Sequence, residues 1–183
     1  ILADGNVTLS GSDGTELLDI DGNVTATNGA LTLQQANVDL AGDANLTGDT
    51  VAADTGTNNV GTITLSGTGT NTVTSDAGST SLADVVAGSG ADANLTVTSL
   101  NNVTLGAVTL GNGGGDLAVT VDSGPGLANQ VLTAGGVIAV TGNATFTGDV
   151  DDDFNFQADV TAGSDLTGDL TITGGDVDLA ALV

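Results

Sequence analysis

The sequence predicts an all-β fold and, within that class, a β-solenoid (parallel β-helix). Short alternations of aliphatic and small polar residues recur along the chain and are stopped by Gly, Asn or Asp, which is typical of strands with one buried face. Related phrases return at intervals close to one solenoid coil, which is roughly 20 residues. Good helix formers are scarce, because the 183 residues include 29 glycines and no lysine or arginine.

The alternation places individual strands along the chain. The clearest lie, in order, at residues 7–9, 63–65, 95–97, 103–105, 108–110, 117–121 and 170–172. The Gly, Asn and Asp residues between them tolerate the positive φ angles of tight turns. Only segments 31–36 and 81–87 are expected to form single helical turns.

Repeated phrases favour the solenoid over other all-β folds. Gly5-Asn6-Val7-Thr8 reappears as Gly22-Asn23-Val24-Thr25, and the segment 145–150 is echoed at 164–170 and at 44–49. The period is irregular, however, and this favours the alternative, an antiparallel β-sandwich or jelly roll with terminal strand exchange. Composition shifts nowhere along the chain, so residues 1–183 are expected to form a single all-β domain.

The expected core is thin and aliphatic. Hydrophobic residues make up 39% of the chain and its mean hydropathy is +0.26, which places it far from the composition of disordered acidic segments. The aromatic residues are Phe146, Phe154 and Phe156, and Met and Trp are absent. Val, Leu, Ile and Ala must therefore fill most of a narrow interior.

The charge balance excludes many functions. The chain has no Lys, Arg or His, and its 23 acidic residues give a net charge of −23. It therefore has no side chain that neutralises a phosphate backbone or an anionic membrane surface. It also lacks the histidine, cysteine and lysine of most nucleophilic sites, so that carboxylate-pair catalysis alone remains open. We expect no enzymatic activity, no nucleic-acid partner and no membrane insertion, since no apolar run approaches about 20 residues.

Aspartates gathered in three places are candidate calcium ligands, because calcium prefers several converging oxygen atoms. The four acidic residues within 149–153 repel one another unless a cation or water separates them, and a solvated turn is the alternative interpretation. Carboxylates of two subunits could also share a divalent cation, and no other cofactor is expected. The candidates are Asp149, Asp151, Asp152 and Asp153, then Asp19 and Asp21, and finally Asp176 and Asp178.

The tripeptide Thr-x-Thr recurs, at 25–27, 62–64, 72–74, 145–147 and 171–173. Threonines arranged in rows on a flat solenoid face bind ice in some proteins. The intervals between the copies are uneven, so the copies need not share one face. Ordinary outward threonines on separate strands are the expected interpretation.

Both ends of the chain are apolar, and this predicts self-assembly. The residues concerned are Ile1, Leu2, Leu179, Leu182 and Val183. Monomeric solenoids need polar caps that protect their end coils, and uncapped ends stack head to tail or exchange strands. We therefore expect a homo-oligomer or filament held through the chain ends.

Segments 22–26, 62–67 and 168–175 resemble the repeats of secreted bacterial β-solenoids, such as filamentous-haemagglutinin-like and autotransporter adhesins. The resemblance covers most of the chain but is compositional, and the absence of basic residues departs from that family. It implies an extracellular, secreted or cell-surface protein used for adhesion or scaffolding. The expected function is a structural subunit of an extracellular fibre or surface layer, and the alternative is an adhesin segment that recognises a cell surface or polysaccharide. Without Lys or Arg the chain also offers trypsin no cleavage site.

Overall fold

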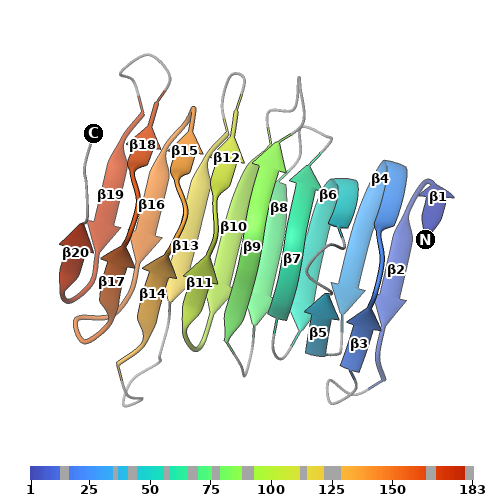
Figure 1. Ribbon diagram of the computed structural model, residues 1–183, viewed down its shortest axis with the longest axis horizontal. Coiled ribbons are helices and arrows are strands. Elements are labelled where there is room, and N and C mark those ends of the chain that lie inside the picture. The colour runs from blue at the N-terminus through green and yellow to red at the C-terminus, as the bar shows by residue number, and fades with distance from the viewer. Residues whose placement is uncertain are drawn as a thin grey trace.

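The computed structural model describes residues 1–12, 17–34, 37–40, 45–55, 58–65, 70–75, 79–87, 93–111, 115–121, 129–163 and 168–179. Every regular element in these ranges is a β-strand, and every strand pairing is parallel. The 20 strands form one continuous sheet that is wound into a β-solenoid (Figure 1). The solenoid prediction is confirmed, and the sandwich alternative is wrong because its strands pair antiparallel.

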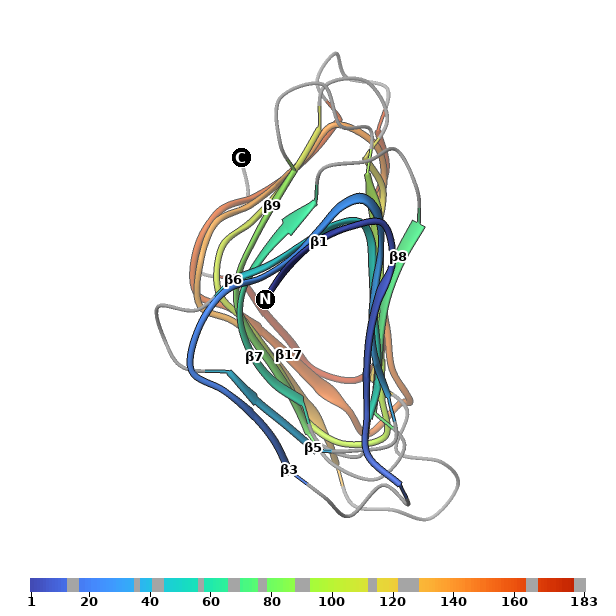
Figure 2. The same cartoon turned by 90° about the vertical axis from the view of Figure 1, so that its right-hand side faces the viewer.

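Each coil passes through three faces in turn, here called faces I, II and III (Figure 2). Face I holds β1 (Leu2–Asp4), β12 (Val108–Leu110), β15 (Ile138–Val140) and β18 (Val160–Ala162). Face II holds β2 (Val7–Ser10), β8 (Thr70–Ser75), β10 (Asn94–Ser99), β13 (Leu117–Val121), β16 (Ala144–Thr147) and β19 (Leu170–Thr173). Face III holds β3 (Leu17–Ile20), β5 (Asn37–Leu40), β11 (Val103–Leu105), β14 (Val131–Ala134), β17 (Asp153–Phe156) and β20 (Val177–Leu179).

Longer strands turn the corners between faces. β4 (Val24–Gln34) and β6 (Asn45–Thr55) run from face I onto face II, whereas β7 (Asn58–Leu65) and β9 (Thr80–Ala87) run from face III onto face I. The strands stack along the long axis, from β1, β2 and β3 at one end to β18, β19 and β20 at the other (Figure 1). Viewed along that axis, the cross-section is roughly triangular, and face II is its straightest side (Figure 2).

The predicted coil length of roughly 20 residues fits the N-terminal coils, where β3 pairs with β5 and β6 pairs with β8 at a separation of 20 positions, whereas several later coils are longer. Over the described strands, residues paired between neighbouring coils are 17 to 30 positions apart. The extra length lies in the connections between faces, such as the one that links β13 to β14. Most strand pairs keep one register along their length, whereas the pairing of β4 with β6 shifts register between Ala26 and Ala30.

The two predicted helical turns are wrong. Residues 31–34 belong to β4 and residues 81–87 form most of β9, while residues 35 and 36 lie outside the described ranges. Leu31 and Leu33 are both buried and stand two positions apart, so they point into the same interior from one strand. Burial in the stacked sheet outweighs the weak local preference for a helical turn.

Alternate residues of each strand point inward and build the core. In β10 the burial pattern alternates strictly between buried and half-buried positions. Most core layers consist of Val, Leu and Ile, as the composition predicts. One coil is aromatic: Phe146, Phe154 and Phe156 are all buried, and the rings of Phe146 and Phe156 pack edge to face with their centroids 4.9 Å apart.

Asparagine and aspartate side chains join successive coils at the corners. At the corner that precedes face II, Oδ1 of Asn94 accepts a hydrogen bond from the amide of Asp116 (2.8 Å). Oδ1 of Asp116 in turn accepts from the amide of Asn143 (2.7 Å), and Oδ1 of Asn143 accepts from the amide of Asp169 (3.0 Å). Each side chain thus satisfies a backbone N–H group of the next coil. Asn and Asp serve equally well at this corner, because both offer Oδ1 as the acceptor.

Candidate functional site

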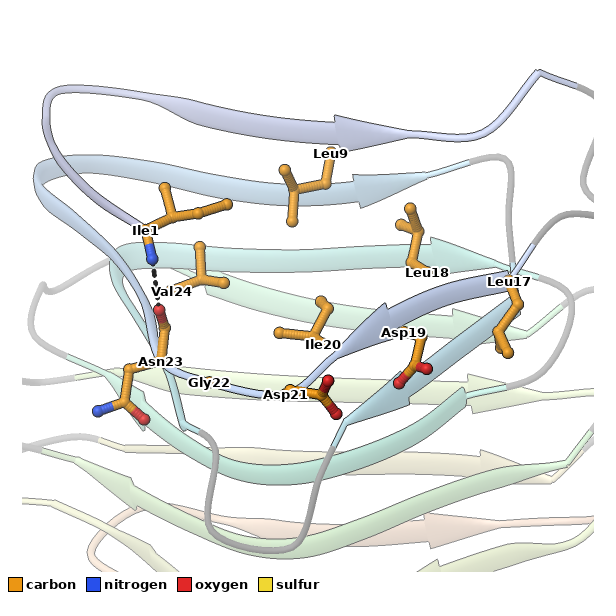
Figure 3. Close-up of a pocket in the computed structure, with 10 residues that line it drawn as sticks. All are labelled: Ile1, Leu9, Leu17, Leu18, Asp19, Ile20, Asp21, Gly22, Asn23 and Val24. Atoms are coloured by element: carbon orange, nitrogen blue, oxygen red, sulfur yellow. Dashed lines mark hydrogen bonds between the residues drawn. The ribbon is translucent and has the colours of Figure 1, made fainter.

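The coil at the N-terminal end leaves its interior open. A hollow of about 520 Å³ lies there between the first strands, and Figure 3 shows the side chains around it. The amino group of Ile1 donates a hydrogen bond to the carbonyl oxygen of Asn23 (2.8 Å) across the rim. The lining is largely aliphatic, with polar residues at the rim: Ile1, Leu9, Leu17, Leu18, Asp19, Ile20, Asp21, Gly22, Asn23 and Val24.

Both ends of the described solenoid present unpaired strand edges. β1 and β2 pair with β4, and β3 pairs with β5. At the other end β18, β19 and β20 pair with β15, β16 and β17. Within the described ranges, the outer edges of these six strands have no partner, so their amide and carbonyl groups are available for further pairing.

Apolar side chains accompany these open edges. At the N-terminal end Ile1 is 65% exposed and Leu2 is 79% exposed, and at the C-terminal end Leu179 is 37% exposed. These three residues are among the five that the sequence predicts to form an assembly surface. The other two, Leu182 and Val183, lie outside the described ranges.

Sequence reasoning missed several apolar residues of the two end coils. They lie on strands rather than at the chain ends, and their alternating pattern is that of any other coil. Only their position in the first and last coils could have indicated that they belong to an assembly surface. The residues are Leu9, Leu17, Leu18, Ile20 and Val177.

A second hollow, of about 480 Å³, lies on face III near the C-terminal end. Three predicted calcium ligands from two separate clusters, Asp153, Asp176 and Asp178, line it. Val131, Phe154, Asn155 and Val177 complete the lining. Asp178 is exposed and lies in register with Asn155 of β17. The fold thus brings together carboxylates that are far apart in the sequence.

The aspartates at 149–153 do not act as one group. Asp149 and Asp151 are exposed, whereas Asp152 is completely buried. Oδ1 of Asp152 accepts a hydrogen bond from the amide of Gln130 (2.9 Å), and Oδ2 accepts from the amide of Asp149 (2.8 Å). Asp152 therefore has a structural role at the corner that precedes β17.

The remaining candidates, Asp19 and Asp21, are exposed and lie beside the N-terminal hollow (Figure 3). Asp19 is in register with Asp39 of β5 on the same face. Across the residues that the structure describes, no three acidic side chains are grouped so as to hold a metal ion. Calcium binding at the eight aspartates stays a prediction.

Replacing Asp152 by alanine is expected to lower the free energy of unfolding by about 2–4 kcal/mol, because two backbone N–H groups lose their acceptor. Urea denaturation followed by circular dichroism measures the effect. Asp151→Ala is the matched control, since Asp151 is exposed in the same turn, and we expect a change within about 0.5 kcal/mol. Equal effects of the two substitutions would contradict the structural role of Asp152.

Face II carries an ordered array of threonines, although the intervals between the Thr-x-Thr copies are uneven and the five copies do not all share one face. One row of positions in register runs through Thr72, Thr96, Ala118, Thr145 and Thr171, and the parallel row two positions along each strand runs through Thr74, Thr98, Thr120, Thr147 and Thr173. We call these two rows the threonine ladder. The Thr-x-Thr copies at 72–74, 145–147 and 171–173 all belong to it, whereas those at 25–27 and 62–64 lie on face I.

Comparison of the chain with protein-family models, with curated proteins and with solved structures found no match. In the described ranges there is also no helix with the length and apolar character needed to cross a membrane.

Proposed function

We propose that this protein is a structural subunit of an extracellular fibre or surface layer, extended by head-to-tail stacking of its end coils. The observation that carries the proposal is the open N-terminal coil, whose aliphatic hollow and unpaired strand edges lie at one end of the rod. The opposite end presents three further strand edges with exposed Val177 and Leu179. Both ends bury apolar surface and gain backbone hydrogen bonds when another coil covers them.

Stacking that continues the parallel register would match the two ends on face III. β20 of one copy would pair with β3 of the next, as β17 pairs with β20 within the chain. Such pairing places Val177 and Leu179 against Leu18 and Ile20, which are half-buried in the open coil. An interface of this kind is heterologous and does not close, so repeated addition produces a filament.

Charge opposes this assembly, and we propose that divalent cations relieve the repulsion. In the same register Asp178 of one copy would lie beside Asp19 of the next, and each subunit carries a net charge of −23. Screening at physiological salt acts over about 8 Å, which leaves adjacent carboxylates repelling each other. Calcium prefers carboxylate oxygens and would bridge the junction.

The extracellular location is part of the proposal and rests on the resemblance to secreted solenoid repeats. The lack of any Lys or Arg supports it, since the chain offers no cleavage site to proteases of trypsin-like specificity. Stability in such an environment comes from stacked hydrogen bonds and aliphatic layers, because the chain has no cysteine.

Leu18→Asp is expected to abolish filament formation, because it places a charge in the apolar hollow. Negative-stain electron microscopy in the presence of calcium should show filaments for the wild-type chain and discrete rods for this variant. Val86→Asp is the matched control: Val86 is 42% exposed and lies on β9 between β7 and β12, away from both end coils, so filaments should persist. Circular dichroism checks that all three proteins keep their β-structure.

Discrete rods of the wild-type chain at every concentration would overturn the fibre proposal and favour the adhesin alternative. Filaments of Leu18→Asp that match those of the wild type would show that the hollow is not the junction. A chelator tests the cation separately: filaments that survive it unchanged would refute bridging by calcium and leave the stacking proposal standing.

A further inference from the structure

The threonine ladder forms a two-dimensional array with regular spacings. Neighbouring strands of a sheet lie about 4.8 Å apart, and alternate residues of one strand are about 6.6 Å apart. Rows of hydroxyl and methyl groups therefore repeat at these distances in two perpendicular directions over β8, β10, β13, β16 and β19. Oxygen atoms on the prism planes of ice repeat at similar distances in two perpendicular directions.

The ladder is held flat and rigid from below. Val97, Val119 and Phe146 lie between its two rows and are all buried, so β10, β13 and β16 are anchored to the core between the two rows. Threonine is β-branched, and its χ1 angle has few accessible states on a strand. Face II is the straight side of the triangle in Figure 2. A rigid flat array binds an ordered lattice without losing conformational entropy.

The hydroxyl groups of the ladder are available to a ligand. Side-chain hydrogen bonds near face II involve corner residues, Asn94, Asp116 and Asn143. Within the part of the chain whose side chains are described, none of the hydrogen bonds uses a hydroxyl of the threonine ladder. The ladder threonines of β10, β13, β16 and β19 are exposed or half-buried, so their hydroxyls must bond to water or to a bound surface.

Charge identifies the kind of partner that the ladder fits. Every position of the ladder over β8, β10, β13, β16 and β19 is Thr or Ala, although the chain as a whole has a net charge of −23 and the next strand, β6, continues the two rows with Ala52 and Asp54. Ions are excluded from ice, so a charged face is a poor match for its lattice and a neutral one is complementary. We infer that the threonine ladder of face II is an ice-binding surface. This function goes beyond the proposed fibre and does not require assembly.

The inference is tested by Thr147→Lys combined with Thr171→Lys, two exposed residues on adjacent strands of the ladder. The matched control combines Thr109→Lys with Thr161→Lys, which are exposed on face I, where Val86 and Ala139 interrupt the row of threonines. Two measurements apply: the partition of fluorescently labelled protein into a growing ice crystal, and the inhibition of ice recrystallisation. We expect both activities in the wild type and in the control, and their loss in the ladder variant.

Exclusion of the wild-type protein from ice would overturn the inference, as would equal loss of activity in the two variants. Retention of the wild type on insoluble neutral polysaccharide together with exclusion from ice would assign the ladder to a polysaccharide surface instead. Circular dichroism of both variants confirms that the solenoid is intact. The Leu18→Asp variant separates this function from the fibre, since it should bind ice as discrete rods.

Discussion

Phe146→Ala is expected to lower the free energy of unfolding by about 3–5 kcal/mol, the usual cost of removing a buried aromatic side chain. Phe146 is completely buried, packs edge to face against Phe156, and lies in register with Val119 and Ile172 on the neighbouring coils. Its removal opens a cavity in the aromatic layer of the core, which Val119 and Ile172 in the neighbouring coils are too short to fill. Urea denaturation followed by circular dichroism measures the loss.

The effect should also be local, because each coil of a solenoid contacts chiefly its neighbours. Hydrogen exchange is expected to show faster exchange in β16, β17 and β19 and little change in β2 and β4. Phe146→Leu is the control, since it retains most of the buried volume and should cost about 1 kcal/mol. A loss for Phe146→Ala no larger than that of the leucine variant would mean that the aromatic layer is not well packed.

Gly106→Ala is expected to cost about 3 kcal/mol, at the upper end of overpacking effects. A Cβ atom at Gly106 would lie 1.3 Å from the carbonyl oxygen of Ala83, which belongs to the coil below. The amide of Gly106 also donates a hydrogen bond to the carbonyl of Leu82 (2.8 Å), so the backbone cannot move away without weakening that bond. The next coil also has a close backbone contact at Gly136, where a Cβ would meet the amide nitrogen of Ala107.

Gly22→Ala is the matched control for this substitution. No atom lies within 4 Å of a Cβ built at Gly22, so alanine there should be neutral or should stabilise the fold by about 0.4–1 kcal/mol through the unfolded state. Thermal and urea denaturation of the two variants measure the difference. Similar stabilities would show that the stacked corner is looser than the structure indicates.

The fold class could be predicted from the sequence because strand alternation and burial act locally. Val, Leu, Ile and Thr at period two determine which side of each strand faces the core. The variation in coil length could not be predicted in the same way. Asn6 precedes a strand of face II and Asn23 precedes a strand of face I, so the repeated phrase Gly-Asn-Val-Thr marks a corner. Since each coil has several corners, intervals between such phrases do not measure a coil.

The candidate sites were predictable only in part, for a related reason. Exposed apolar residues at the N-terminal end follow from the sequence, since Ile1 and Leu2 stand there. Asp152 could not be recognised as a structural residue, because its partner Gln130 is one coil away. The threonine ladder was hidden by unequal spacing: Thr98, Thr120 and Thr147 follow one another at different intervals yet lie side by side.

The corners also decide where this chain tolerates change in length. A peptide inserted between β13 and β14 would lengthen one connection and leave the pairings of both strands with their neighbouring coils unaltered. Insertion of a single residue within β10 or β16 would instead move the side chains that follow it in the same strand to the opposite side of the sheet. Peptides can therefore be inserted into the connections at the corners without changing the strand pairings of the three faces. Peptides inserted at the same corner of successive coils would be spaced by the rise of one coil.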